Sequence, residues 1–525
     1  MPSIIRMEEI VNPTKSLEEL FENQTDLTDF AETVEQHFSE AFFEATKFQQ
    51  IPVLNLQNPS GAHPPRGLVR FRGMIQDPST STEMYLLKLP NGKLGGWGIE
   101  HPDATTNDEI DYSNLRECNV HWAVNVPGET QWATQELDGE STSNDSKIQV
   151  STRPHKYPEA GRDHIGVQLK LYSGSQNESL KSTDIATFVG ILTSEHLSSS
   201  EAEEQHEVPT LHVLFTTKRC TEVSRPFPVS GTSYTSETVR LSLLRWLAQE
   251  ALSGDLDAAE WVLLTAIART QTRHPPIYPP SLTISHFPPP PSGSSSQPTL
   301  SLALSLVLTL AHTLPITVDY LNSRKFNPES KDEDLHSGEL QLPKGTVLVV
   351  AETGLQEGKV LEKGLMNIQA LQEVMSSQTL AYAFPFSRFT FPTDISCIVL
   401  CQGAKSTFFK TDIIVPLKPQ STEPSNLYKS TEEINLPPPE ELAAFRDWIV
   451  GARSGKIQIT EDVSKFIQQD FVNDRKEDPS VTSDDLMRRM TIAKLYALSM
   501  HQENLTADLW NKAKSLDERR RLRST

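Results

Sequence analysis

The sequence predicts an α+β protein of several domains, in which a strand-rich part, an α/β part and a helical end follow one another. Its 525 residues exceed the roughly 250–300 at which a single hydrophobic core stops growing. Short runs rich in Val, Ile, Leu, Phe and Tyr fill residues 68–217, whereas apolar strands alternate with helices over 236–420. Residues 436–525 carry helical periodicity alone, so we expect the last part to be helical.

The composition is that of a folded protein. Hydrophobic residues make up 37% and charged residues 22%, which fits neither a disordered nor a membrane protein. The 36 prolines exceed the usual ~5% share and predict long connections between folded parts. The net charge of −21, with a pI near 5.2, repels a phosphate backbone unless a local basic face overrides the field. The charge therefore favours a protein partner over a DNA-coating role.

The cysteines and the apolar runs predict a soluble protein in a reducing, intracellular compartment. No apolar leader follows the first residues, and the widely scattered cysteines do not suggest a disulfide framework. The most apolar stretch, residues 300–314, is too short to cross a bilayer and contains Ser, Thr and His. We expect it to be a buried helix. The four cysteines are Cys118, Cys220, Cys397 and Cys401.

Residues 1–60 are predicted to form an N-terminal helical segment. Within it, residues 16–47 are acidic and carry Leu and Phe at helical spacing, as one or two amphipathic helices do. Docking of these helices on the chain's own next domain is the simpler interpretation. Docking on a partner protein is the alternative.

Residues 65–218 are predicted to form a small β-barrel of the oligonucleotide/oligosaccharide-binding (OB) type, because five or six short strands over about 150 residues suit that architecture. Residues 134–163 lack apolar periodicity and are expected to be a disordered insertion, and residues 194–207 a second mobile loop. The expected strands are 68–77, 83–89, 121–129, 167–173, 184–192 and 210–217.

Residues 236–420 are predicted to form an α/β domain with a parallel sheet, and residues 436–525 a C-terminal helical domain. The runs 345–353 and 395–401 are continuously apolar, which is typical of strands buried on both faces. The other expected elements are the strand 281–285 and the helices 236–252, 256–270, 300–313, 366–376, 441–452, 461–473, 483–500 and 506–523.

A search for catalytic motifs finds none in a suitable setting: HExxH, GxSxG, a CxxC pair and GxGxxG are all missing. Cys397 and Cys401 resemble a ligand pair, but on a strand at ~3.3 Å per residue they lie about 13 Å apart, too far for one zinc ion. We expect both to be buried structural residues. The sequence therefore predicts no catalytic, cofactor-binding or metal-binding residue, and no cofactor.

The C-terminal half nevertheless has the layout of a nucleotide-hydrolysing domain whose working parts are missing. A P-loop needs a strand, a glycine-rich turn ending in Gly-Lys-Ser/Thr, and a helix. Between the strand 281–285 and the next helix lies HFPPPPSGSSSQPT, which has no lysine and whose prolines lack amide donors. The second half of such a site is an apolar strand that ends in Asp-Glu. Here the corresponding strand, GTVLVVAE, ends in Ala351-Glu352, so the Asp is absent. Glu352 is open to three interpretations: a non-functional remnant of an ATP site, a helix N-cap, or a solvated residue.

Parts of this half look like segments of the minichromosome-maintenance (MCM) helicase subunits. Residues 338–379 are similar to their second ATP-site segment, with the GxLxLxxGxVL lead-in and the helix ALQEVMSSQT. Residues 392–406 fall where those subunits carry a sensor strand, and residues 483–516 are similar to their closing helices. The resemblance implies a degenerate AAA+-like domain without a P-loop.

The whole chain resembles the MCM-complex-binding protein family more closely than the helicase itself. The match extends in family order from about residue 66 to residue 520, although each string alone is unspecific. The strings are VRFRGMIQD (69–77), VNVPGETQW (124–132), LKLY (169–172), FVGIL (188–192), VRLSLLRWLAQEALSGDLDAAEWVLL (239–264), GELQLPKGTVLVV (338–350) and DFVNDRKEDPSVTSDDL (470–486).

The resemblance implies a nuclear, non-catalytic binding partner of MCM helicase subunits. Such a protein forms an alternative MCM assembly in which it takes one subunit's place, and acts in DNA replication, helicase unloading from chromatin and sister-chromatid cohesion. Its chromatin association would be indirect, with no membrane and no small-molecule substrate. The chain resembles a shorter, fungal-type member. The family's partner-binding residues cannot be assigned to positions here.

The alternative is a single-stranded DNA or chromatin-binding factor that uses the barrel, with aromatic side chains stacking on bases beside basic residues. Its candidate face is Arg66, Arg70, Phe71, Arg72 and Lys88. The basic ending, residues 517–525, fits a nuclear-import signal and a charged helix end equally well.

Overall fold

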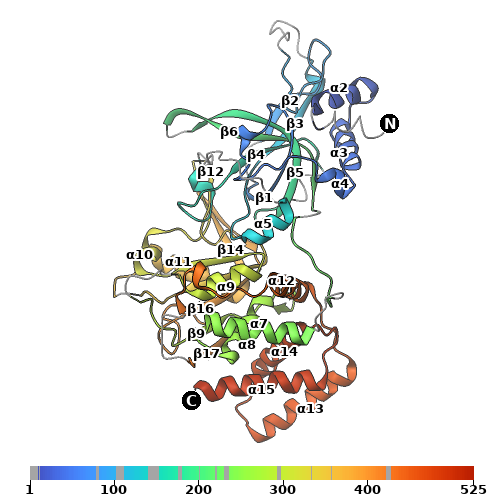
Figure 1. Cartoon of the computed structure of the whole chain (residues 1–525). Helices are drawn as coiled ribbons and strands as arrows, with labels where there is room; N and C mark the ends of the chain where they lie inside the picture. The colour runs from blue at the N-terminus through green and yellow to red at the C-terminus, as the bar shows by residue number, and fades with distance from the viewer. Residues whose placement is uncertain are drawn as a thin grey trace.

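The computed structural model places a strand-rich part above a larger sheet-and-helix part, with the termini at opposite ends (Figure 1). We call these two parts the barrel and the body. Among the described residues, no helix is long and apolar enough to cross a membrane. The structure describes residues 10, 12–78, 82–101, 111–139, 153–174, 180–199, 202–218, 221–229, 236–291, 297–332, 334–355, 357–420 and 427–524.

Three N-terminal helices cover one side of the barrel (Figure 1). Phe30, Val34 and Phe38 recur every fourth residue, so they share one helix face, and all three are buried. That face belongs to the same apolar cluster as Val189 and Phe215 of the barrel strands. The predicted docking of the helices on the chain's own domain is confirmed. The helices are α2 (Pro13–Asn23), α3 (Phe30–Ala41) and α4 (Ala45–Phe48).

Five strands of the N-terminal sheet close into a ring. β1 pairs with β5 on one side and with β3 on the other, so the order β1-β5-β6-β4-β3 returns to its start, with β2 added on β3. Val167, Leu169 and Leu171 alternate along β4 and lie in the interior cluster, as the two-residue period of a strand requires. The strands are β1 (Leu68–Asp77), β2 (Thr82–Leu86), β3 (Leu115–Val124), β4 (Gly166–Leu171), β5 (Ile185–Ser199) and β6 (Ala202–Thr217).

The predicted disordered insertion at 134–163 was wrong at both ends. Helix α5 (Gln131–Asp138) extends into its start, and its end contains a 3-10 turn, η3 (Pro154–Lys156), in which Lys156 is buried. The middle, 140–152, lies outside the described residues. At the described end of the segment, His155, Lys156 and Glu159 form contacts with the body, which local apolar periodicity cannot reveal.

The expected mobile loop 194–207 was also wrong. β5 and β6 continue through it as an antiparallel hairpin whose register extends from Thr187↔Thr217 to Ser199↔Ala202. Backbone pairing, rather than an apolar pattern, holds these strand ends.

A parallel five-stranded sheet forms the centre of the body, in the order β10-β13-β16-β9-β17. Val347 and Val349 of β13 pack in the cluster that contains α7, α8 and α9, whereas Leu348 and Val350 pack in the cluster that contains α11. The predicted burial of this strand on both faces is confirmed. The strands are β9 (Leu282–Ser285), β10 (Ala311–Pro315), β13 (Thr346–Ala351), β16 (Ile395–Leu400) and β17 (Ile413–Pro416).

The expected helix 300–313 ends early. α9 stops at Val307, and residues 311–315 form strand β10, in which His312 and Leu314 alternate inward. The apolar run is long enough for one helix, but its second half pairs with β13 as a parallel strand instead.

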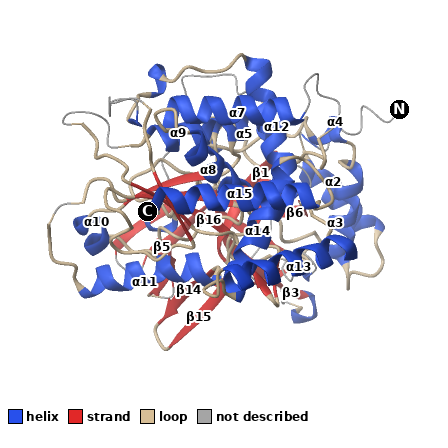
Figure 2. Ribbon diagram, turned by 90° about the horizontal axis from the view of Figure 1, so that it is seen from below, coloured by secondary structure: helices blue, strands red, loops and turns tan. Residues whose placement is uncertain are grey.

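Apart from α10, which the sequence did not predict, the remaining helices of the body lie at the expected positions, and the mixed α and β organisation of the chain is confirmed. The helices expected as a separate C-terminal domain share one continuous core with the sheet and α7–α9. In Figure 1, α13, α14 and α15 lie at the lower end of the molecule, and Figure 2 shows that end from below. The body helices are α7 (Ser236–Ala251), α8 (Leu256–Ile267), α9 (Thr299–Val307), α10 (Val318–Ser323), α11 (Glu362–Ser377), α12 (Pro439–Ser454), α13 (Glu461–Glu477), α14 (Ser483–Ser499) and α15 (Ala507–Ser524).

Two small sheets complete the body: a two-stranded ribbon, β7-β8, and a four-stranded sheet in the order β12-β11-β14-β15. The second of these lies on the side that faces the barrel (Figure 1). The strands are β7 (Thr272–Arg273), β8 (Pro276–Ile277), β11 (Glu329–Lys331), β12 (Asp334–His336), β14 (Thr379–Phe384) and β15 (Ser387–Pro392).

Candidate functional site

The strands β13, β16 and β9 are neighbours, so the structure brings together the segments whose order suggested a nucleotide site. Because parallel strands end at the same edge, this edge is where an α/β sheet ordinarily binds its ligand. Ala351 and Glu352 lie there, at the end of β13. We call this place the carboxyl edge.

Glu352 is a buried acceptor and only 1% exposed, so its interpretation as a solvated residue was wrong. Its carboxylate accepts hydrogen bonds from the Ser406 hydroxyl (2.6 Å) and the Thr407 amide (3.0 Å). Burial raises the pKa of Glu352, although these two donors act in the opposite direction. The side chain thus fixes the loop that follows β16.

Two backbone amides of the turn after β9 donate hydrogen bonds to carbonyls of the chain itself. The amide of His286 donates to the carbonyl of Gly403 (3.1 Å), and the amide of Phe287 donates to the carbonyl of Cys401 (2.9 Å). A phosphate cradle needs free backbone amides at this place. The described part of the turn therefore has two of its donors already engaged.

A later segment covers the start of α9. The Tyr428 hydroxyl donates to the carbonyl of Pro288 (2.7 Å), and the Lys429 amide donates to the Thr299 hydroxyl (2.6 Å). The rings of Phe287 and Tyr428 meet edge to face, with centroids 6.0 Å apart. Both rings are buried, so an apolar contact occupies the place beside the helix start.

Cys397 and Cys401 are both buried, as expected. Cys397 lies within β16, and Cys401 follows its end. Burial raises the pKa of each thiol to about 12. Both are therefore protonated at neutral pH, whereas a metal ligand or a nucleophile would need the thiolate.

The two arginines at the centre of the proposed nucleic-acid face are not free to contact a nucleic acid. Arg70 is 7% exposed, and its guanidinium lies over the Phe48 ring, 5.3 Å from the centroid. Arg72 is paired with Glu129 (2.5 Å) and Asp138 (3.2 Å). Burial opposes the charge of Arg72, but the two carboxylates outweigh it and raise its pKa above the ordinary value.

The other three candidates on this face differ from one another. Phe71 points into the barrel core and is fully buried. Arg66 forms an ion pair with Glu100 (2.5 Å), and Lys88 is exposed. The structure does not bring the five residues together as an open stacking surface.

The barrel is joined to the body through a buried ionic network that the sequence did not predict. Lys156, which is 0% exposed, lies between two carboxylates: Asp77 of β1, at 2.7 Å, and Asp334 of β12. Removing these charges from water is costly unless each one is paired. Separating the barrel from the body would break the pair between Lys156 and Asp334, so the network stabilises the contact between the two parts.

Neutral hydrogen bonds extend this junction. The Gln341 side-chain amide donates to the carbonyl of Gln76 (2.8 Å), and the hydroxyls of Ser182 and Tyr382 lie 2.8 Å apart. On the far side of the junction, the Trp132 indole N–H donates to the carbonyl of Leu308 (2.9 Å). No motif marks these residues, because each is an ordinary polar residue whose partner is remote in sequence.

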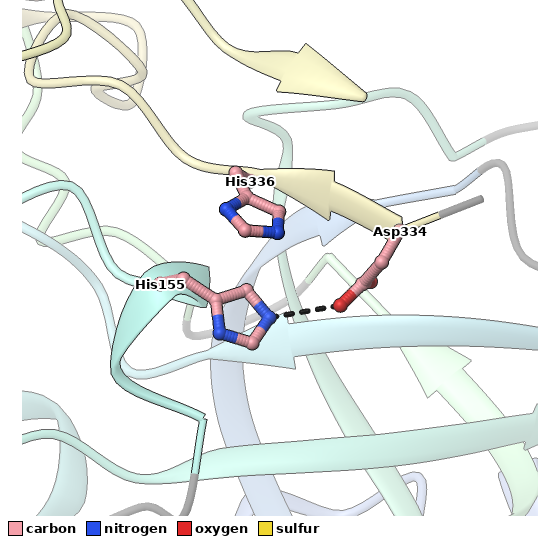
Figure 3. Close-up of side chains that lie close together, drawn as sticks. All are labelled: His155, Asp334 and His336. Carbon is pink, nitrogen blue, oxygen red and sulfur yellow. Dashed lines mark hydrogen bonds and ion pairs between the residues drawn. The ribbon is translucent and has the colours of Figure 1, made fainter. Parts of the chain in front are cut away.

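Three side chains of metal-ligating types, His155, Asp334 and His336, lie close together where the barrel meets the body (Figure 3). His155 Nε2 lies 2.8 Å from Asp334 Oδ2, and the His155 and His336 rings stack with centroids 4.3 Å apart. The ligand atoms of these three residues all lie within 4.8 Å of one another, in an arrangement that could hold a metal ion. Because 179 residues separate His155 from Asp334, spacing could not have predicted this cluster.

The basic ending is part of the fold. Arg523 makes a two-pronged contact with Asp255, at 2.7 and 2.9 Å, and Asp255 in turn caps α8. Arg521 pairs with Asp517 (3.2 Å) on the same helix. The structure therefore gives this segment a helix-docking role, which favours the helix-end interpretation.

Comparison with known proteins identifies the family. The family model described as "Mini-chromosome maintenance replisome factor" matches residues 38–164 and 138–524. Three proteins named mini-chromosome maintenance complex-binding protein are similar. The one from Arabidopsis thaliana is 26% identical over 571 residues (93% of this chain, 92% of the relative), and that from Salmo salar 26% over 631 residues (98% and 97%). The one from Homo sapiens is 31% identical over 291 residues (54% and 44%). The chain belongs to the mini-chromosome maintenance replisome factor family.

Proposed function

We propose that the chain is a non-catalytic binding partner of the MCM helicase subunits, with which it forms an alternative assembly in DNA replication. Family membership supports this, as do relatives matched over more than nine-tenths of both chains whose name describes binding to the MCM complex. The net charge of −21 also fits a protein partner better than a nucleic acid.

The proposal that the protein is non-catalytic rests on the carboxyl edge, where polar groups are already hydrogen-bonded within the chain. The amides of His286 and Phe287 and the carboxylate of Glu352 are all engaged within the chain. A transferring phosphoryl group needs positioned donors and a metal ion, and here neither the P-loop lysine nor the strand-end aspartate is present. The body can thus present a subunit-like surface without a hydrolytic cycle.

The fold assignments fit this proposal. The adjacency of β9, β13 and β16 supports a degenerate AAA+-like body over 236–420. The closed five-strand ring supports an OB-type barrel over 65–218. We further propose a nuclear location, an indirect chromatin association through the helicase subunits, and roles in helicase unloading and sister-chromatid cohesion.

Purification of the tagged protein with and without nuclease tests the proposal. We expect helicase subunits to co-purify in near-stoichiometric amounts and to remain bound after the DNA is digested. Loss of the subunits on digestion would instead make the protein a DNA or chromatin binder. A Glu352→Gln variant serves as the matched control, since it keeps the shape of the strand end and should purify with the same subunits.

A further inference from the structure

The cluster of His155, Asp334 and His336 is built from both parts of the molecule. His155 lies on η3, which is inserted between two strands of the barrel, whereas Asp334 and His336 lie two positions apart on β12 of the body. Figure 3 shows the two imidazole rings and the carboxylate converging on one another. The side chains of His155 and Asp334 are 32% and 23% exposed, so an ion from solvent can reach them.

The backbone beneath the cluster is already fixed. The Ser337 amide donates to the carbonyl of His155 (2.8 Å), which ties η3 to the end of β12. The next residue, Lys156, is buried and holds Asp334 through Oδ1, so that Oδ2 faces His155. Metal-binding carboxylates and histidines are commonly oriented by outer contacts of this kind. The η3 backbone and the Asp334 carboxylate are therefore held in place before any ion arrives.

The charges around the cluster select the kind of ion. Arg153 lies 3.6 Å from Asp334 Oδ2, and Lys156 pairs with both Asp334 and Asp77. Two cations thus balance the two carboxylates, and little net negative charge remains to attract a hard ion such as Mg²⁺ or Ca²⁺. Affinity has to come from the two imidazoles, which suit zinc, copper, nickel and iron.

We propose that His155, Asp334 and His336 bind one divalent transition-metal ion of the zinc class, with solvent in the fourth position. Zinc takes nitrogen and oxygen ligands at about 2.0–2.2 Å in tetrahedral sites, which places the donors roughly 3.3–3.6 Å apart. The widest separation, at most 4.8 Å, therefore needs to narrow by about an ångström, and the 2.8 Å contact between His155 Nε2 and Asp334 Oδ2 needs to open. Small rotations of the three side chains can supply this movement. The bound ion joins the barrel to the body, so its binding stabilises their contact.

Calorimetric titration of the chelator-stripped, full-length protein with ZnCl₂ tests the proposal. We expect one equivalent of zinc to bind saturably, with no competition from excess Mg²⁺ or Ca²⁺, and a rise in the thermal midpoint. Co²⁺ should give the visible absorption of a four-coordinate site. Absence of saturable zinc binding to the wild-type protein overturns the proposal, whatever the variants do.

Variants locate the site. His155→Ala and His336→Ala should each weaken zinc binding about tenfold or more, since each removes one of three ligands. His196→Ala, at an exposed histidine of β5 outside the cluster, should leave zinc affinity unchanged. Urea unfolding of the metal-free variants checks that they are folded. Zinc binding that survives in both folded cluster variants places the ion elsewhere and contradicts the proposal.

Discussion

The carboxyl edge of the sheet and the junction between barrel and body are both lined with buried polar groups, yet they use them differently. At the edge, Glu352 bonds to Ser406 and Thr407, 54 and 55 residues away within the body. At the junction, Gln76 and Gln341 meet across 265 residues, from separate parts of the molecule. The edge closes a place where a ligand would sit, and the junction fixes two parts in one arrangement. The difference fits the proposed role of a binding partner, in which two parts are held in one arrangement.

A charge in the body core should produce the largest loss. Val349 of β13 is 1% exposed between two helix layers. We expect Val349→Asp to cost about 4–5 kcal/mol or more, because an unpaired carboxylate is buried there. Val472→Asp, at an exposed position of α13, should change stability by less than about 0.5 kcal/mol. Denaturant unfolding measures both, and a stable Val349→Asp protein would contradict the buried placement of β13.

Breaking the ionic network at the junction should produce the second-largest loss of stability. Lys156→Ala leaves Asp77 buried without its cation, so we expect a loss of about 3–5 kcal/mol in the free energy of unfolding. Lys465→Ala, which removes an exposed i,i+4 pair with Glu461, should cost less than about 0.5 kcal/mol. Similar small losses in both variants would show that the junction contributes little and that the barrel and body are loosely connected.

Acid should weaken the barrel through His212. Burial lowers the pKa of His212 to about 3, Lys170 and Arg66 add to the effect, and Glu195 faces the ring at 3.6 Å. An unfolded histidine titrates near 6.5, so the unfolded state binds the proton first as the pH falls. The stability that neutral His212 contributes to the folded state is complete above pH ~6.5. It is lost as the pH falls toward the folded-state pKa, at about 1.4 kcal/mol of unfolding free energy per pH unit.

The variant His212→Asn tests this origin of acid sensitivity. Asparagine does not titrate, so the slope of unfolding free energy against pH between about 6 and 4 should become shallower than in the wild-type protein. His121, whose pKa burial lowers to about 4, remains and keeps part of the slope. An unchanged slope in a folded variant would show that His212 is not the buried neutral group described.

Local periodicity predicted the helices and buried strands well, because each needs only neighbouring residues to specify it. The continuous apolar run Val347–Val350 is covered by helices on both faces, and any sheet of this kind would bury it equally well. The sequence failed where a remote partner decides the outcome. β10 needs β13 beside it, and Lys156 and His155 need β12, which lies on another part of the chain. Polar composition then suggested disorder where it encodes a contact.

The smallest effect is expected from Glu352→Gln. The glutamine oxygen still accepts one of the two hydrogen bonds made by the carboxylate, so stability should change by no more than about 1 kcal/mol. Co-purification with helicase subunits and complementation of a null strain should be nearly unchanged. Loss of function in a variant that stays folded and partner-bound would assign the strand end a chemical role.

Calorimetric titration of the wild-type protein with Mg²⁺ and ATP tests most directly whether the carboxyl edge is closed. We expect no saturable heat of binding over about 1 µM to 1 mM, the usual range for enzyme substrates, because the amides of His286 and Phe287 are bonded within the chain. Saturable binding in that range would mean that the edge opens to a nucleotide, and it would contradict a non-catalytic scaffold.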